Sequence, residues 1–180
     1  MITFVVPTIG RPTLTRAIAS LYKQTISDWR AVVCFDNIKP TIESNDKIFV
    51  CRFSGNISGW RAGIVRNFAT RFVTTPWIGC LDDDDSVTPD YLEKFQEYSK
   101  SAPDIIVFQM MFSPDKILPQ NAIEMFTTNR VGISFAFRRE ILNKVQFADM
   151  KCEDVNFLRA ARMKGFKVLF CPHICYKVNQ

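Results

Sequence analysis

Short apolar runs alternate with amphipathic stretches along the chain, and this alternation limits the accessible folds more than any other feature. The apolar runs have the length and near-continuous hydrophobicity of strands that are buried on both faces. The stretches between them repeat apolar residues every three to four positions, which predicts helices. The predicted strands are 2–7, 29–35, 47–53, 77–81, 105–112, 131–137 and 167–171, and the predicted helices are 12–23, 59–73, 88–100, 138–144 and 153–164. This order predicts an α/β fold with a mostly parallel sheet and helices on both faces.

Composition and continuity favour one soluble domain. The chain has 180 residues, of which 47% are hydrophobic, and it contains 16 phenylalanines but only 7 glycines. These values exclude a disordered tail, a collagen-like polymer and a loop-rich disulfide miniprotein. The segment 114–129 has no clear pattern, and we expect a loop with one short element there. Because no repeat or linker divides the chain, we predict a single domain over 1–180.

The six cysteines indicate a reduced protein rather than a disulfide framework. Most of them lie in or beside strand-like runs, where a free thiol behaves as a small hydrophobic side chain. We therefore expect a cytoplasmic location, and no apolar run reaches the ~20 residues of a membrane-spanning helix. Cys171, His173 and Cys175 would share one strand face. A zinc site there is disfavoured, because the cluster lacks a paired cysteine motif and a fourth ligand.

Polar side chains follow several predicted strands at the points where the strands end. In open α/β sheets, ligands bind outside the carboxyl ends of the strands. The sequence therefore predicts that these side chains converge on one crevice. They are Thr8, Gly10 and Arg11 after the first strand, Asp36 after the second, Asp82–Asp85 after the fourth and His173 after the last.

Four consecutive aspartates are the strongest local signal. Asp82, Asp83, Asp84 and Asp85 stand together in a chain whose formal net charge is +5. Adjacent carboxylates repel one another, so such a block lowers stability unless a cation or strong hydrogen-bond donors compensate. Hard oxygen ligands suit Mg²⁺ or Mn²⁺, which also bridge to phosphate oxygens. We predict a divalent metal site, and the alternative is a solvated acidic turn before the helix that begins near Pro89.

Four motifs follow one another along nearly the whole chain. They are V-V-P-T-I-G-R-P at 5–12, S-L-Y-K-Q-T at 20–25, R-N at 66–67 followed by L-D-D-D-D at 81–85, and E-D at 153–154 followed by Arg159 and G-F-K-V at 165–168. In this order they resemble the motifs of GT-A-fold glycosyltransferases, particularly family 2. The resemblance implies a single Rossmann-like domain with a mixed, mostly parallel central sheet. It also implies a nucleotide-binding half at about 1–100 and an acceptor-binding, catalytic half at about 101–180.

The resemblance implies transfer of a sugar from a nucleotide-diphosphate donor, commonly a UDP-sugar, to a hydroxyl group of a glycan or another acceptor. It further implies inversion at the anomeric carbon and a requirement for Mn²⁺ or Mg²⁺. Asp36 would contact the base, Arg66 the base or the phosphates, and Asp82 the ribose. The full set of implied donor-binding residues is Thr8, Gly10, Arg11, Asp36, Arg66, Asp82 and Asp83.

The resemblance also implies metal-binding and catalytic residues. Asp84 and His173 would ligate the metal, although an unbroken run of aspartates leaves the register open by one position. Asp154 would accept the proton of the acceptor hydroxyl, near a helix N-terminus that keeps its carboxylate ionised. Adjacent residues on a helix point about 100° apart, so Glu153 is expected to touch the acceptor instead.

Two other functions remain open. Asp82 to Ser86 approximates the DxDx[TV] motif of haloacid-dehalogenase-type phosphatases, with Asp82 as the nucleophile, although three strands precede it and Ser86 departs from the motif. A non-catalytic nucleotide-binding module is the other alternative. Nucleic acid is not an expected partner, because the basic residues form no run. The acceptor region at 113–129 is short, so we expect that a partner, a second copy in a homodimer, or the rest of a larger protein completes the acceptor site.

Overall fold

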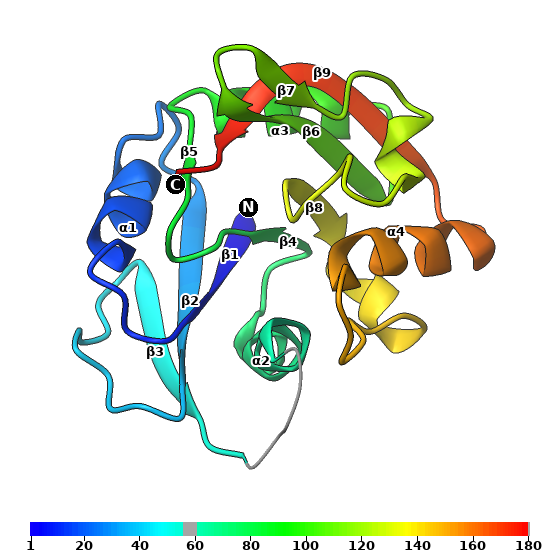
Figure 1. The fold of residues 1–180 in the computed structure, drawn as a ribbon. Coiled ribbons are helices and arrows are strands. Elements are labelled where there is room, and N and C mark those ends of the chain that lie inside the picture. The colour runs from blue at the N-terminus through cyan, green and yellow to red at the C-terminus, as the bar shows by residue number, and fades with distance from the viewer. Residues whose placement is uncertain (56–60, 180) are drawn as a thin grey trace.

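The apolar runs form the strands of one sheet in the part of the chain that the computed structural model describes, residues 1–55 and 61–179 (Figure 1). The strands are β1 (Ile2–Thr8), β2 (Trp29–Asp36), β3 (Ile48–Phe53), β4 (Trp77–Cys80), β5 (Ser86–Val87), β6 (Ile105–Ser113), β7 (Lys116–Leu118), β8 (Phe135–Arg138) and β9 (Val168–Lys177). Their order in the sheet is β3–β2–β1–β4–β8–β6–β9–β5, with β7 paired to β6.

The N-terminal half of the sheet is parallel, and its strands end along one edge. β1 pairs in parallel with β2 and β4, and β2 pairs in parallel with β3. Beyond β4 the sheet is mixed, because β8 runs antiparallel to both β4 and β6 while β9 is parallel to β6. The predicted α/β fold with a mixed central sheet is confirmed, and its parallel half brings three strand ends together.

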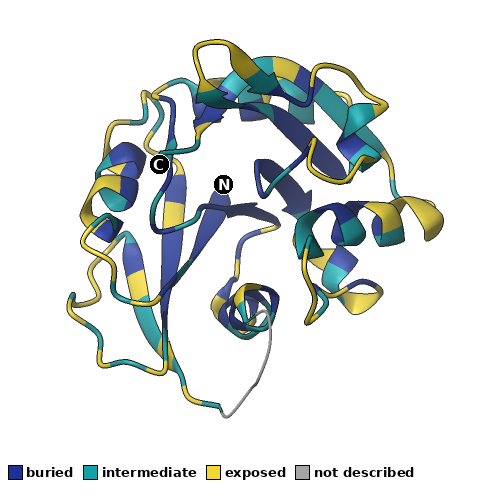
Figure 2. Cartoon of the chain, viewed as in Figure 1, coloured by how far each residue is buried: buried dark blue, intermediate teal, exposed yellow. Residues whose placement is uncertain are grey.

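Helices lie on both sides of the parallel strands. The α-helices among the described residues are α1 (Leu14–Tyr22), α2 (Ala62–Ala69), α3 (Tyr91–Ser99) and α4 (Glu153–Met163), and short 3₁₀ turns cover Thr70–Phe72, Glu124–Phe126 and Arg139–Asn143. Figure 1 shows β2 and β3 between α1 and α2. Figure 2 shows that most of the central strands are buried, whereas the helices expose one side to solvent. No helix in the described ranges combines the length and the apolar character that crossing a bilayer requires.

Several predicted boundaries are corrected. The helix predicted at 59–73 begins, within the described residues, at Ala62 and tightens to a 3₁₀ turn after Ala69, while residues 59 and 60 lie outside the described part. The strand predicted at 131–137 starts only at Phe135, because the N–H of Phe135 bonds the carbonyl of Ile133 in a tight turn. The helix predicted at 138–144 is a 3₁₀ segment.

The corrected end of the last strand matters most for the site. The strand predicted at 167–171 continues past Pro172, and β9 runs on to Lys177. Its pairing with β6 shifts register between Phe108 and Gln109 and again after Gln109. Such bulges let a strand carry a proline, which has no N–H to donate to the ladder. Because the strand continues, the hydroxyl group of Tyr176 lies beside the aspartate block, within hydrogen-bond distance of the N–H of Asp82.

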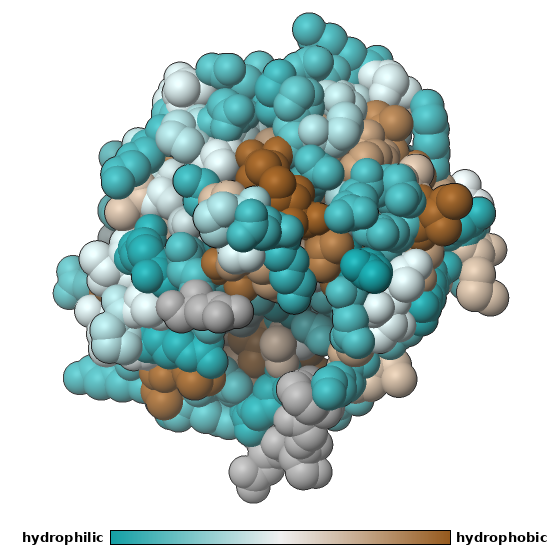
Figure 3. Space-filling model, turned by 45° about the horizontal axis from the view of Figure 1, so that its top comes forward, coloured by the Kyte–Doolittle hydropathy of each residue, from teal (hydrophilic) through white to brown (hydrophobic). Residues whose placement is uncertain are grey.

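Aromatic side chains fill the core beside α4. The rings of Phe147 and Phe157 stack with their centroids 4.4 Å apart, and Phe135 and Phe137 pack around them. This cluster also lies under the site, because the guanidinium carbon of Arg66 is 5.8 Å from the Phe147 ring centroid. Some apolar residues stay on the surface. Figure 3 shows hydrophobic residues gathered at the centre of one face, among hydrophilic ones and beside a hollow.

Candidate functional site

A cleft of about 460 Å³ opens where β1, β2 and β4 end. The convergence predicted from the sequence is therefore observed for the first, second and fourth strands. The residues that line the cleft are Pro7, Thr8, Ile9, Arg11, Asp36, Arg61, Ala62, Val65, Arg66, Asp82, Asp83, Asp84 and Glu153.

The end of β1 and the loop that follows it donate hydrogen bonds to Asp83. Its carboxylate accepts hydrogen bonds from Thr8 Oγ1 at 2.6 Å and from Arg11 Nη1 at 2.7 Å, and the residue is only 3% exposed. The N–H of Gly10 donates to Thr8 Oγ1 at 2.9 Å. Gly10 has φ +82°, and a Cβ there would lie 2.5 Å from Ile38 Cδ1, so this turn requires glycine. The carboxylate of Asp83 thus ties the β1 loop to the aspartate block.

Asp36 forms a second ion pair in the wall of the cleft. Arg61 donates from Nε to Asp36 Oδ2 at 2.8 Å and from Nη2 to Oδ1 at 2.7 Å. A bidentate pair of this kind fixes the orientation of both groups. Arg61 precedes α2 and was not predicted as a site residue. No local pattern indicated it, because its partner lies 25 positions earlier in the chain.

Arg66 joins the aspartate block to α4. Its Nη2 donates to Asp82 Oδ1 and its Nη1 to Glu153 Oε1, both at 2.5 Å. The side chain of Arg66 is 3% exposed, against 34% for Asp82 and 16% for Glu153. Burial alone would lower the pKa of Arg66, but attraction to the nearby acidic groups, Asp82 foremost, raises it above the ordinary value. Its predicted contact with the nucleotide stays a prediction, since both terminal nitrogens already have protein partners.

Three carboxylates can share one metal ion. Asp82, Asp84 and Asp85 each place an oxygen such that all three atoms lie within 4.8 Å of one another. An oxygen-only donor set of this kind fits Mg²⁺ or Mn²⁺. Arg16 donates to the main-chain carbonyl of Asp84 at 2.6 Å, which helps to fix the loop. Burial raises the pKa of Asp85 to about 6.

His173 is not part of this group, which corrects the prediction that it ligates the metal. It lies inside β9 rather than after a strand end, and its ring packs edge-on against Tyr98 of α3 with centroids 6.0 Å apart. Its neighbours Cys171 and Cys175 are buried. The error follows from the strand boundary, since the polar strand end of β9 is four residues further on, at Lys177.

A second cavity of about 400 Å³ adjoins the first. The two share Arg66, Asp82 and Glu153 as lining residues. Asp154 lines only the second cavity, where burial raises the pKa of its carboxyl group to about 6. Gly132 faces it, because a Cβ there would lie 3.7 Å from Asp154 Oδ2. The other lining residues are Asp85, Met110, Phe112, Lys116, Asn129, Val131, Ile133, Tyr176 and Val178.

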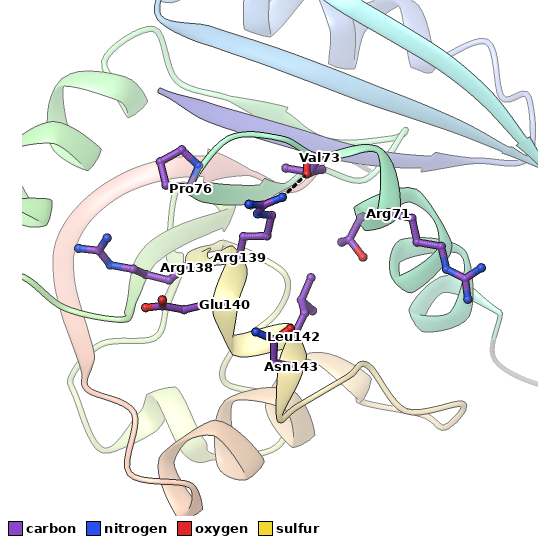
Figure 4. A pocket seen from close by; sticks show the side chains of 9 residues that line it. Arg71, Val73, Pro76, Arg138, Arg139, Glu140, Leu142 and Asn143 are labelled. Atoms are coloured by element: carbon purple, nitrogen blue, oxygen red, sulfur yellow. Dashed lines mark hydrogen bonds between the residues drawn. The ribbon is translucent and has the colours of Figure 1, made fainter.

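A third hollow, of about 520 Å³, lies at the opposite end of β4 (Figure 4). Three arginines line it, but Figure 4 shows the side chains of Arg71 and Arg138 pointing in opposite directions. Arg139 donates to the carbonyl of Val73 at 3.1 Å. The arginines do not converge on one point, and the chemistry of the molecule is concentrated in the two adjoining cavities.

Comparison with known proteins agrees with this geometry. The model of the family described as Glycosyl transferase family 2 matches residues 3–153. The crystal structure of S. aureus TarS 1–349 is similar with a TM-score of 0.78 at 17% identity, and the match covers 99% of this chain and 60% of that one. TarS 1–349 in complex with UDP-GlcNAc gives a TM-score of 0.80 at 16% identity, covering 99% and 58%. No curated protein matches the sequence.

The two TarS matches support the fold, and this chain spans about 60% of the length of TarS 1–349. The family match extends over the β1 loop, the aspartate block and the start of α4. Because the match to glycosyl transferase family 2 includes the aspartate block after β4, it replaces the alternative that this block belongs to a haloacid-dehalogenase-type phosphatase. The chain belongs to glycosyl transferase family 2.

Proposed function

We propose that the protein transfers a sugar from a UDP-linked donor to a hydroxyl group of a glycan or similar acceptor, with inversion and with a divalent metal ion. The observation that carries this proposal is the pair of adjoining cavities that share Arg66, Asp82 and Glu153. A transferase needs two substrates side by side, and the shared wall is where donor and acceptor would meet. The complexes of TarS with UDP and with UDP-GlcNAc support the donor class.

The first cavity suits the donor. Asp36, oriented by Arg61, would accept from the N–H groups of a base, while Asp82, Asp83 and Asp84 line another part of the same cleft. Asp82, Asp84 and Asp85 would hold Mn²⁺ or Mg²⁺. Such an ion, when bound, neutralises the negative charge that develops on the departing nucleoside diphosphate. Arg11, 3.0 Å from Asp84 Oδ2, adds a fixed positive charge beside it.

The second cavity suits the acceptor. It combines an apolar side, formed by residues such as Phe112 and Ile133, with the carboxyl groups of Glu153 and Asp154. Sugars and other polyols bind well to such surfaces, because carboxylates accept hydrogen bonds from hydroxyl groups while the ring packs on apolar side chains. Lys116 also lines this cavity.

Asp154 is the proposed general base. A base must be ionised and within reach of the hydroxyl group whose proton it accepts. With a pKa of about 6, Asp154 is mostly ionised at neutral pH yet binds a proton more readily than an ordinary aspartate. It lines the acceptor cavity and not the donor cleft. An acceptor activated there would attack the sugar from the side away from the diphosphate, which inverts the anomeric carbon.

Thermal unfolding with UDP, GDP and CMP, each with and without Mn²⁺, tests the donor and the metal. We expect stabilisation by UDP that depends on Mn²⁺; at 100 times Kd a ligand stabilises by about 2.7 kcal/mol. Asp84→Ala should abolish the Mn²⁺-dependent part, whereas Asp115→Ala, in the exposed β6–β7 turn, should retain it. Absence of a shift with every nucleotide would overturn the proposal.

Release of UDP from UDP-sugars in the presence of candidate acceptors tests the reaction itself. The Asp154→Asn variant should bind UDP as the unmodified protein does but release far less of it. If the unmodified protein binds UDP and no sugar donor is ever turned over, the chain is a nucleotide-binding module instead.

A further inference from the structure

The hydroxyl group of Tyr176 reaches the aspartate block from the far end of the chain. Tyr176 is 1% exposed, and its Oη accepts a hydrogen bond from the N–H of Asp82 at 3.1 Å. The carboxyl group of Asp85 interacts with the same hydroxyl. One phenol group therefore connects two of the three carboxylate residues that can share an ion.

The end of β9 is fixed on both sides, so this hydroxyl has a defined position. Tyr176 is opposite Val87 of β5 on one side and Met110 of β6 on the other. β5 follows the aspartate block directly, so the block leads straight into a strand that pairs with β9. The block itself is closed into a turn by the N–H of Asp85, which donates to the carbonyl of Asp82 at 3.2 Å.

Asp85 receives a second donor from the same segment. The N–H of Asn179 donates to Asp85 Oδ1 at 3.0 Å, and Asn179 Nδ2 donates to Ser86 Oγ at 3.1 Å. Repulsion between adjacent carboxylates favours spreading the turn, and donors that hold individual oxygens oppose it. Asn179 is such a donor on Asp85, and Tyr176, which interacts with the same carboxyl group, also accepts from the N–H of Asp82.

We propose that Tyr176 is a positioning residue for the divalent-ion site, which holds Asp82 and Asp85 in the arrangement that binds the ion. This inference rests on the proposed function, because it concerns the metal site of that reaction. Groups that hydrogen-bond to metal ligands orient them, and their loss typically weakens metal affinity 10–100-fold. Tyr176 also lines the second cavity, but its proposed effect on the ion passes through Asp82 and Asp85.

Calorimetric titration with Mn²⁺ alone, on the whole chain without nucleotide, tests the proposal. Tyr176→Phe keeps the ring and removes only the hydroxyl, and we expect its Kd for Mn²⁺ to rise at least 10-fold. Tyr91→Phe is the matched control. Tyr91 is also 1% exposed, but its hydroxyl has no hydrogen-bond partner among the described residues, so its removal should leave the Kd unchanged.

The outcomes separate the two proposals. If the unmodified protein binds no Mn²⁺, the metal-dependent function fails. If it binds Mn²⁺ and Tyr176→Phe binds equally well, only the positioning role is overturned. If both tyrosine variants lose affinity alike, the loss reflects the fold, and the positioning role is again overturned.

A second pair of variants, tested by the same calorimetric titration with Mn²⁺, leaves the core unchanged. Asn179→Pro removes the N–H that donates to Asp85, whereas Asn179→Ala removes the same side chain and keeps that N–H. We expect weaker Mn²⁺ binding for the proline variant alone. Equal affinity of the two variants would show that donors from this segment do not position the carboxylate.

Discussion

Asp154→Asn should make the protein more stable at pH 8 while it removes the proposed base. The carboxyl group of Asp154 lies in the second cavity, with Glu153 beside it in the chain. Burial is the main cause of its raised pKa, and repulsion from Glu153 adds to it, although the N–H of Val155 donates to Asp154 Oδ1 at 2.7 Å. An asparagine keeps this hydrogen bond and has no charge to bury.

The magnitude follows from the pKa. A rise from 3.8 to about 6 on folding corresponds to about 3 kcal/mol, because each tenfold change in proton affinity is worth about 1.4 kcal/mol. The side chain keeps some contact with solvent in the cavity, so we expect a net effect of about 2 kcal/mol. For a domain of this size that is roughly 4–8 °C in Tm.

The gain in stability of the Asp154→Asn variant depends on pH. Between pH 4 and 6 the folded protein holds the proton of Asp154 more tightly than the unfolded chain does. The free energy of unfolding therefore falls as the pH rises through this window, and the penalty is fully present above about pH 6. The variant should gain most of its stability at pH 8 and much less at pH 4, where the carboxyl group is neutral in the folded protein and only partly ionised in the unfolded chain.

Thermal unfolding in EDTA at pH 4 and pH 8 measures the difference directly. Asp115→Asn, in the exposed β6–β7 turn, is the matched control for loss of a negative charge. An equal gain at both pH values would mean that packing rather than charge is responsible. A loss of stability at pH 8 would refute the reasoning, because the carboxylate would then be stabilised by its surroundings.

Further substitutions test the framework of the site by urea unfolding. Arg66→Met should lower the free energy of unfolding by about 3 kcal/mol, because it breaks a buried ion pair, and Arg66→Met with Glu153→Gln should recover part of the loss. Asn67→Ala should lower it by about 1–3 kcal/mol, since the amide both donates to and accepts from the main chain of Phe147. Phe157→Ala should lower it by about 3–5 kcal/mol by opening a cavity in the aromatic cluster.

The parallel half of the fold was predictable because it depends on local patterns. Each buried parallel strand is a short apolar run, and the polar residue after it lies at the carboxyl edge of the sheet. This is why the sequence predicts that Thr8, Asp36 and the aspartate block lie close together, and Asp82, Asp83 and Asp84 do line one cleft with Thr8 and Asp36. Glu153 and Asp154 were assigned to the site through motifs, since nothing in their periodicity separates them from an ordinary acidic first turn.

The remaining features depend on contacts between distant segments. β5 has two residues and exists because β9 pairs with it, so no local pattern predicts it. The bulges that carry β9 past Pro172 are also set by pairing, with β6. The placement of His173 and the omission of Tyr176 are therefore the same error, made at one strand boundary. Arg61 was not predicted for a similar reason, because its partner Asp36 lies at the end of β2, 25 positions earlier in the chain.

The four aspartates, identical in sequence, acquire different surroundings, and this narrows the choice of metal ligand. Asp83 and Asp85 are buried, at 3% and 7% exposure, while the side chains of Asp82 and Asp84 are 34% and 40% exposed. Asp83 is satisfied by Thr8 and Arg11, which leaves it outside the group that can share an ion. Of the other three, Asp84 is the one whose carboxylate is held by a single arginine at the surface, so it has the most freedom to bind an ion. A block that would be unstable as four equivalent charges thus folds because donors from distant segments engage Asp82, Asp83 and Asp85, while Asp84, paired with the exposed Arg11, keeps the most exposed carboxylate.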